Sequence, residues 1–199
     1  DRKLLSDARL VVIAGVEQPG EAPVKLLRDY VSQGGQLIIA AGAHSRALAR
    51  MAGDRIPLDT ERGYHVEWDM AAPRLTRPAC PTSRGFYLCP MTGRLRVAGT
   101  VELGGLHLPP SPHRIARLVK GARAIFPDLP EPDRNWMGFR PSLPDSRPVI
   151  GPSSGGTDII HAFGHGHIGV TLAPITARIV AAIVAGRQPD ITATAATRF

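Results

Sequence analysis

A glycine-rich segment near the C-terminal end has the residue types and spacing that most clearly indicate chemistry. It reads Gly164-His-Gly-His-Ile-Gly-Val-Thr171 and lies between an apolar run, residues 158–163, and an apolar segment of helical spacing, residues 171–185. Backbone N–H groups at a helix N-terminus lack partners within the helix and carry partial positive charge, so they hold anions or an electron-rich carbonyl. Glycines let a flat ligand approach the backbone closely. The alternative is a tight turn that binds nothing.

The segment formally matches G-x-G-x-x-G, the fingerprint of dinucleotide-binding folds. That fingerprint needs a second parallel strand after the helix, carrying an acidic residue. Here the helical segment is followed by Asp190 and a polar tail, so we do not expect a complete dinucleotide site at this turn. Three histidines, His161, His165 and His167, lie nearby, but no carboxylate accompanies them at useful spacing. We therefore predict no metal site.

The elements that must position this turn predict an α/β or mixed α+β fold in three segments. Residues 1–56 are expected to form a parallel strand–helix–strand layer, residues 57–137 an antiparallel meander with one helix, and residues 138–199 a strand–turn–helix that returns to the first lobe. The expected strands are 9–14, 36–41, 63–68, 85–89, 94–102, 135–140 and 158–163. The expected helices are 21–33, 45–51, 111–126 and 171–185. The tail after Pro189 is expected to fray.

Composition narrows the class of protein. Of the 199 residues 43% are hydrophobic, which is enough for a buried core, and no apolar stretch is long enough to span a membrane. The net charge of +7 comes mostly from single, scattered arginines, so no nucleic-acid partner is expected. Two cysteines cannot build a disulfide scaffold. We expect a cytoplasmic protein without membrane association, and its start at Asp1 suggests a fragment or a processed piece.

Three blocks of sequence resemble the flavin-dependent D-amino-acid oxidase family, in its D-amino-acid dehydrogenase and glycine-oxidase branch. The first, Ala40-Ala-Gly-Ala-His-Ser45, is similar to an alanine–glycine motif of that family, which often has Trp where His44 stands. The second, residues 138–151, reads GFRPSLPDSRPVIG and is similar to the block G-x-R-P…P-D-x-x-P-x-I-G. The third is the glycine-rich segment itself with the Leu-Ala-Pro174 that follows.

The resemblance implies FAD as the cofactor and oxidation of an amine or D-amino acid to the imine by hydride transfer to the flavin. It places the glycine-rich turn under the pyrimidine edge of the isoalloxazine, where N–H groups stabilise negative charge on the reduced ring. The residues it assigns to the cofactor are Ala41, Gly42, Gly164, His165, Gly166, His167, Ile168, Gly169 and Thr171.

The resemblance assigns Arg140 to the substrate carboxylate, because a planar guanidinium suits a bidentate carboxylate. The alternative for Arg140 is an ordinary salt bridge. Tyr64 and Tyr87 lie on strands of the expected meander, and either phenol could hydrogen-bond a substrate carboxylate; an aromatic side chain packed on a sheet is the alternative for each. Tyr87 aligns better with a substrate-side tyrosine and is preferred, so Arg140 and Tyr87 are the predicted catalytic residues.

The N-terminal part departs from the family pattern. Full members begin with a strand, G-x-G-x-x-G and a helix that hold the ADP half of FAD, and no such segment precedes residue 40. Residues 1–39 resemble instead a strand–helix–strand of the glutamine-amidotransferase-like kind. We therefore expect weak FAD binding and negligible turnover unless a second chain or a missing N-terminal portion supplies the other half. The competing hypothesis is a non-catalytic α/β module.

Overall fold

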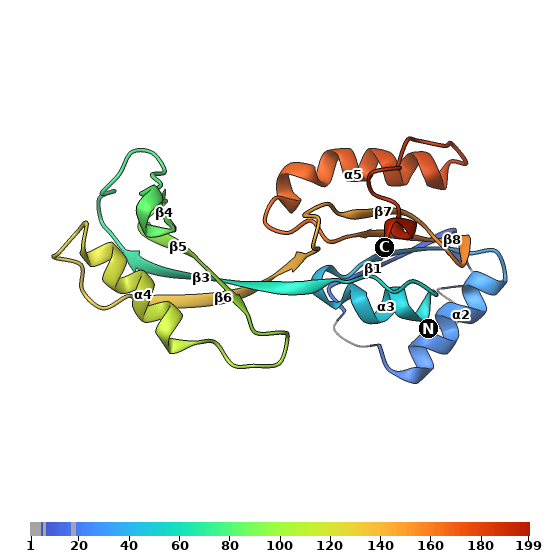
Figure 1. Ribbon diagram of the computed structural model, residues 1–199, viewed down its shortest axis with the longest axis horizontal. Helices are drawn as coiled ribbons and strands as arrows, with labels where there is room; N and C mark the ends of the chain where they lie inside the picture. Colours follow the sequence, from blue (N-terminus) through green and yellow to red (C-terminus); the bar gives the residue numbers. More distant parts are fainter. Residues whose placement is uncertain (1–4, 6, 17–18) are drawn as a thin grey trace. The chain divides into compact units, whose positions relative to one another are not determined.

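The structure is a computed structural model that describes residues 5, 7–16 and 19–199. It has a mixed α/β fold with two four-stranded sheets, as predicted. The chain divides into two units, which are described separately (Figure 1). Unit 1 comprises residues 1–59 and 140–199, and unit 2 comprises residues 60–139.

Unit 1 contains a sheet of order β1-β2-β8-β7. Its strands are β1 (Leu10–Ala14), β2 (Gln36–Ala40), β8 (Gly156–Phe163) and β7 (Val149–Ser153). The first three are parallel, with Ile13 opposite Ile39 and Ile39 opposite His161, whereas β7 runs antiparallel to β8. The C-terminal strand therefore returns beside the N-terminal strand–helix–strand, and the carboxyl ends of β2 and β8 are neighbours.

Helices cover both faces of this sheet (Figure 1). The face formed by Ile13, Leu37 and Ile39 packs against α2 (Glu21–Ser32) and α3 (Ser45–Met51). The opposite face, with Ile38 and Ile160, packs against α5 (Gly169–Val184). Burial on both faces explains why β2 has a continuous apolar run, Leu37 to Ala40, rather than an alternating pattern.

Unit 2 is built on an antiparallel sheet of order β4-β5-β3-β6, covered on one face by a helix. Its elements are β3 (Asp59–Asp69), β4 (Phe86–Met91), β5 (Arg94–Leu103), α4 (Pro112–Arg123) and β6 (Arg134–Ser142), the end of which belongs to unit 1. Alternate residues of β3, namely Tyr64, Val66 and Trp68, form the core with α4. The intervening residues lie on the other face, as the period of a strand requires.

Two details differ from expectation. The tail does not fray: the N–H of Ile150 in β7 donates to the Thr194 carbonyl at 3.0 Å, and Ala196 is buried. β7 itself was not predicted, because Gly and Pro within its few residues indicate a turn. The tail stays ordered because it covers this edge strand and provides hydrogen-bond partners that β8 cannot provide.

Candidate functional site

The glycine-rich turn connects the carboxyl end of β8 to α5. Gly164 and Gly166 have φ values of +85° and +54°, in the left-handed region that favours glycine. The residue before α5, Ile168, provides no side-chain cap, and Gly169 begins the helix. The first N–H groups of α5 therefore have no partner within the helix and carry its positive dipole end. Thr171, in the same first turn, is exposed.

The end of β6 contacts the glycine-rich turn through the backbone. The Gly166 N–H donates to the Pro141 carbonyl at 2.8 Å. At Gly164 a Cβ atom would come within 2.5 Å of the Leu143 side chain, so only glycine fits that close approach. Arg140, half-buried, directly precedes Pro141. The predicted carboxylate-binding arginine and the predicted flavin turn thus belong to one hydrogen-bonded substructure of unit 1.

His165 is turned away from the open side of the turn. Its Nε2 lies 2.9 Å from the Thr176 hydroxyl of α5, and burial lowers the pKa of the imidazole. The side chain therefore ties the turn to the helix, and the part of this residue left for a ligand is its backbone. His167 and Ile168 are exposed.

Ala41 and Gly42 lie at the same edge of the sheet as the turn. They follow β2, whose Ile39 is opposite His161 of β8, so the two parallel strands end side by side. Gly42 has a φ of +57° and begins a short 3₁₀ turn over Gly42–His44. Ligands of open α/β sheets bind at the carboxyl ends of the strands, which is where both predicted cofactor segments lie.

A buried histidine–aspartate pair holds β8 in place beneath the turn. His161 is fully buried, and its Nε2 lies 2.7 Å from Oδ2 of Asp54, in the loop after α3. Burial lowers the pKa of His161 more than the Asp54 carboxylate raises it. Burial raises the pKa of Asp54, but hydrogen bonds from Ser154, His161 and Ser153 outweigh it and lower that pKa overall.

This pair was not predicted from the sequence, where His161 was considered only as a metal ligand. The sequence signal that could have indicated this pair is the histidine within an apolar strand, because a buried polar side chain needs a hydrogen-bond partner. Among the described residues, no group of three or more His, Cys, Asp and Glu side chains is placed to hold a metal ion. No helix in the described part of the chain has the length and apolar character needed to cross a bilayer.

In unit 2 the two candidate tyrosines have different surroundings. Tyr64 is buried, and its hydroxyl donates to Glu102 and accepts from Arg62 at 3.1 Å and from the Ser111 N–H at 3.0 Å. Tyr64 is therefore part of a structural network. Tyr87, on β4, is 57% exposed. Its phenol is accessible to a ligand.

A charge cluster on the open face of the unit 2 sheet was also not predicted. Glu67 is buried and accepts from Arg96 Nε at 2.6 Å and Arg94 at 3.0 Å, and Arg134 lies 3.6 Å away. Burial raises the pKa of Glu67, but the hydrogen bond and charge of Arg96 and the charge of Arg94 outweigh it, so the pKa is lowered overall. The period of two within β3 and β5 was the available signal, since it places these charges on one face.

The residues at the sheet edge fit the carbonyl-bearing edge of a flavin ring, which gains negative charge on reduction. The turn offers backbone N–H donors and the positive end of a helix with no side-chain cap. A Cβ built at Gly166 would meet nothing nearer than Ser142 Oγ at 3.9 Å, so this side of the turn is open. With the His165 imidazole turned onto Thr176, the donor set is neutral backbone and suits an edge that gains negative charge.

Comparison with known proteins finds relatives among amino-acid oxidoreductases. The FAD dependent oxidoreductase family, DAO, matches residues 8–183. This range includes β1 and α2, so the family match begins well before residue 40, in the part of the sequence that was expected to depart from the family. A D-amino-acid oxidase of Bradyrhizobium diazoefficiens is 41% identical over 162 residues, covering 77% of this chain and 38% of its own. A glycine oxidase of Pseudomonas aeruginosa is 30% identical over 162 residues, covering 80% of this chain and 44% of its own. The chain thus spans less than half the length of these curated relatives.

The fold leads to the same family. The crystal structure of glycine oxidase from Geobacillus kaustophilus superposes with a TM-score of 0.73 at 26% identity, over 82% of this chain and 45% of that one. The range that the family model matches, residues 8–183, includes the turn after β8, the end of β6 and the alanine–glycine segment after β2. The chain therefore belongs to the DAO family of FAD-dependent oxidoreductases.

Proposed function

We propose that this chain is the flavin-facing and substrate-facing part of an FAD-dependent enzyme that oxidises an amine or a D-amino acid to the imine. The observation that carries the proposal is the hydrogen bond from Gly166 to Pro141, because it joins the turn suited to the flavin ring to the segment that holds Arg140. Family membership supports the cofactor, and the relatives' names support the substrate class.

Each part of the site has one task in this proposal. When bound, the flavin would accept a hydride from the substrate carbon, and loss of a proton from the amine nitrogen would complete the C=N bond of the imine. The first N–H groups of α5 donate to the ring edge that gains negative charge, and the helix dipole acts in the same direction. Arg140 holds the substrate carboxylate with two parallel hydrogen bonds and so fixes the orientation of the reacting carbon.

Tyr87, in unit 2, stays a predicted substrate-side residue, and its phenol is exposed. Backbone of Ala41 and Gly42 lines the same sheet edge as the turn. The pyrophosphate and adenosine of FAD need a second glycine-rich helix start, which we infer is supplied by a polypeptide segment outside this chain. This inference is supported by the share of the relatives that the chain spans, 38% and 44%.

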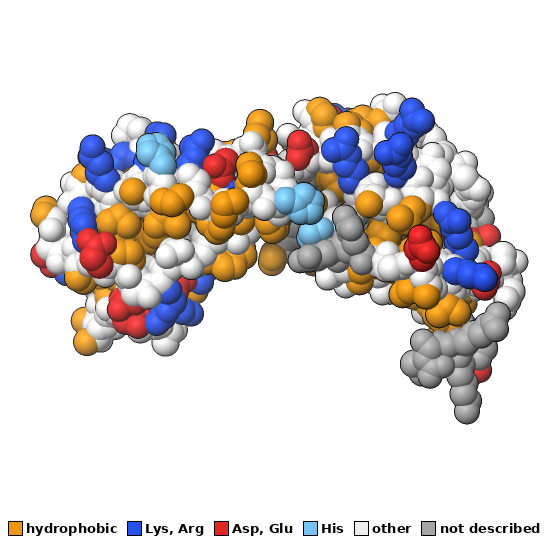
Figure 2. All heavy atoms as spheres, turned by 90° about the horizontal axis from the view of Figure 1, so that it is seen from below, with side chains coloured by type: hydrophobic (Ala, Val, Ile, Leu, Met, Phe, Trp, Pro, Cys, Tyr) orange, Lys and Arg blue, Asp and Glu red, His pale blue; other side chains and the backbone are white. Residues whose placement is uncertain are grey.

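A nucleic-acid partner is not favoured. Figure 2 shows basic side chains in several separate groups on the face in view, with acidic side chains among them. Glu67 lies close to three arginines and neutralises part of their positive charge; they are Arg94, Arg96 and Arg134. A basic patch or stripe is the usual electrostatic footprint of a nucleic-acid-binding surface.

Complementation tests the proposal. The chain is mixed with the part of the Bradyrhizobium relative that it does not match, and retained flavin is measured by visible absorption after gel filtration with FAD. The mixture is expected to retain the cofactor and the chain alone to lose most of it. D-amino acids added without oxygen should then bleach the flavin band.

Arg140→Leu in the same mixture is expected to retain FAD and to slow bleaching by about tenfold to a hundredfold, the range for a lost charge-assisted pair. Arg147→Leu, an exposed arginine in the loop that follows, is the matched control and should bleach normally. Retained flavin that no amine or D-amino acid bleaches would favour the non-catalytic module. Tight stoichiometric FAD binding by the chain alone would contradict the need for a second segment.

A further inference from the structure

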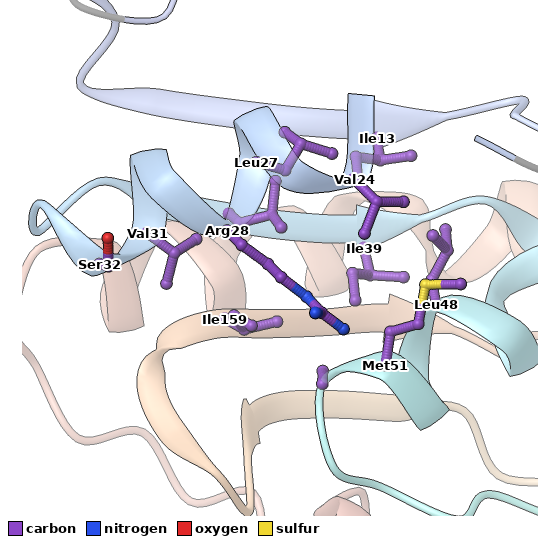
Figure 3. A pocket seen from close by; sticks show the side chains of 12 residues that line it. Ile13, Val24, Leu27, Arg28, Val31, Ser32, Ile39, Leu48, Met51 and Ile159 are labelled. Atoms are coloured by element: carbon purple, nitrogen blue, oxygen red, sulfur yellow. The ribbon is translucent and has the colours of Figure 1, made fainter. Parts of the chain in front are cut away.

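An apolar cavity of about 240 Å³ lies in unit 1 between α2, α3 and the sheet. Figure 3 shows its walls: side chains of α2 on one side, Leu48 and Met51 of α3 on another, and Ile39 and Ile159 of the sheet beneath. Ile39 and Leu48 are 2% and 5% exposed and form the buried floor of the cavity. Met51 is 51% exposed and lies at the mouth of the cavity.

The cavity is open to solvent on one side, so a ligand can enter it without a rearrangement of the core. Apolar cavities do not hold water well, and one of about 150 Å³ lined by Leu, Ile and Phe takes up benzene. The wall chemistry of this cavity therefore favours an apolar guest larger than benzene.

One charged group lies at the cavity. Arg28 is the charged residue among those that line it, and its side chain extends from α2 into the space between the two helices (Figure 3). Within the described part of the chain, Arg28 takes part in none of the ion pairs that the structure shows. Its alkyl stem lies along apolar surface, and its planar head offers a fork of donors that matches a carboxylate.

We propose that this cavity binds a small carboxylate with an apolar tail. The tail lies on the floor formed by Ile39 and Leu48, and the carboxylate pairs with Arg28 at the mouth. A cationic head would be repelled by Arg28, and a neutral guest would form no ion pair with that exposed guanidinium. The combination of an apolar floor and a single cation at the rim is what selects this class of ligand.

The cavity is distinct from the flavin turn. It lies on the α2 and α3 face of the sheet, whereas the turn follows the end of β8 and leads into α5 on the other face. It is lined by none of the residues proposed to hold FAD or substrate. The proposal is therefore independent of the oxidoreductase activity, and either can fail alone.

Calorimetric titration of the full chain with octanoate and decanoate tests the proposal. One saturating site is expected, with a negative heat-capacity change from buried apolar surface and tighter binding for the longer tail. Octanol should bind more weakly than octanoate, and octylamine should not bind. Absence of carboxylate binding to the wild-type chain would overturn the proposal.

Two substitutions separate the head from the tail. Arg28→Met keeps the apolar stem and should weaken octanoate about tenfold while leaving octanol unchanged. Lys25→Met removes an exposed cation from the same helix away from the cavity and should change neither. Equal octanoate affinity in Arg28→Met and wild type would overturn the pairing.

Val31→Phe fills the space and should abolish binding of octanoate and octanol alike. Because a larger side chain can disturb packing, Val24→Phe provides a second filling variant from another turn of α2, and thermal melts identify which variant is folded. Undiminished binding in a folded filling variant would show that the ligand occupies another place. A cavity that takes up octanol but not octanoate would likewise contradict the proposed class of ligand.

Discussion

The N–H of Gly166 donates to the carbonyl of Pro141 at 2.8 Å and so joins two segments that sequence alone separates. One is the turn that leads into α5, and the other is the end of β6, where Arg140 precedes Pro141. The backbone that is suited to a flavin ring and the arginine proposed to hold a carboxylate therefore share one support within unit 1. Preorganisation of this kind places donors before any ligand arrives.

Gly164→Ala is expected to lower the free energy of unfolding by about 2–4 kcal/mol. The alanine would adopt a strained left-handed backbone conformation, and its Cβ would also crowd a neighbouring side chain. The backbone has a φ of +85°, and the Cβ would lie 2.5 Å from the buried side chain of Leu143. Urea denaturation followed by circular dichroism measures the change.

Gly186→Ala is the control for backbone strain alone. Gly186 has a φ of +72°, and its Cβ would meet no atom within 4 Å. A loss of about 1 kcal/mol is expected there. Equal losses for the two variants would show that the approach of Leu143 to Gly164 has no energetic weight.

The two candidate tyrosines should respond differently to loss of the hydroxyl. Tyr64→Phe removes the hydroxyl that accepts from the Ser111 N–H and from Arg62, and should destabilise unit 2 by about 1–3 kcal/mol. Tyr87→Phe removes a hydroxyl from a side chain that is 57% exposed and should change stability by less than about 0.5 kcal/mol. Thermal or urea unfolding of both variants checks this, and a strong effect at Tyr87 would indicate an internal role.

Glu67→Gln should destabilise the chain by about 2 kcal/mol or more, because it removes the charge that compensates Arg94, Arg96 and Arg134 at a buried position. Glu131→Gln is the matched control: its side chain is 82% exposed, and its pair with Arg123 is worth less than about 1 kcal/mol. Urea midpoints measure both. An unchanged urea midpoint for Glu67→Gln would show that solvent screens the repulsion among the three arginines.

Acid should destabilise the chain through His161. Burial lowers the pKa of this imidazole from 6.5, so below that pH the unfolded chain binds a proton that the folded chain excludes. The free energy of unfolding therefore falls as the pH drops below 6.5. The structural reason is that Nε2 is placed to donate to Asp54, whereas the buried Nδ1 has no hydrogen-bond partner in the described structure and would become an unsatisfied donor.

His161→Gln should flatten this pH dependence without removing all of it, because burial also lowers the pKa of His65 and His165. Unfolding is measured by urea titration at a series of pH values for both proteins. Parallel curves for the variant and the wild type would mean that His161 does not contribute to the acid sensitivity.

Elements with strong periodicity were predictable from the sequence. The strand at 36–41 and the helix at 21–33 match β2 and α2 to within a residue, because doubly buried strands and amphipathic helices each impose a pattern. β7 was missed because Val149–Ser153 contains Gly and Pro, although it forms a hairpin with β8, which begins at Gly156. Its hydrogen bond to Thr194 joins it to a distant segment, which local pattern does not encode.

The candidate site was predictable where it depends on backbone. The turn at Gly164 to Gly169 was predicted from its glycines, and the structure places it at a helix start, beside the end of β2. The orientation of His165 toward Thr176, the burial of Tyr64 and the partner of His161 were not predictable. Each depends on a residue contributed by another element, so only the folded chain specifies it.

The last residues of the chain act on the loop that follows Arg140. The Arg198 guanidinium donates to the Asp145 carboxylate at 2.8 Å and to the Arg147 carbonyl at 2.7 Å. This loop is therefore anchored by a side chain 53 residues away from Asp145 in the sequence. Loss of the Arg198 guanidinium would remove both anchors at once without changing any residue of the glycine-rich turn.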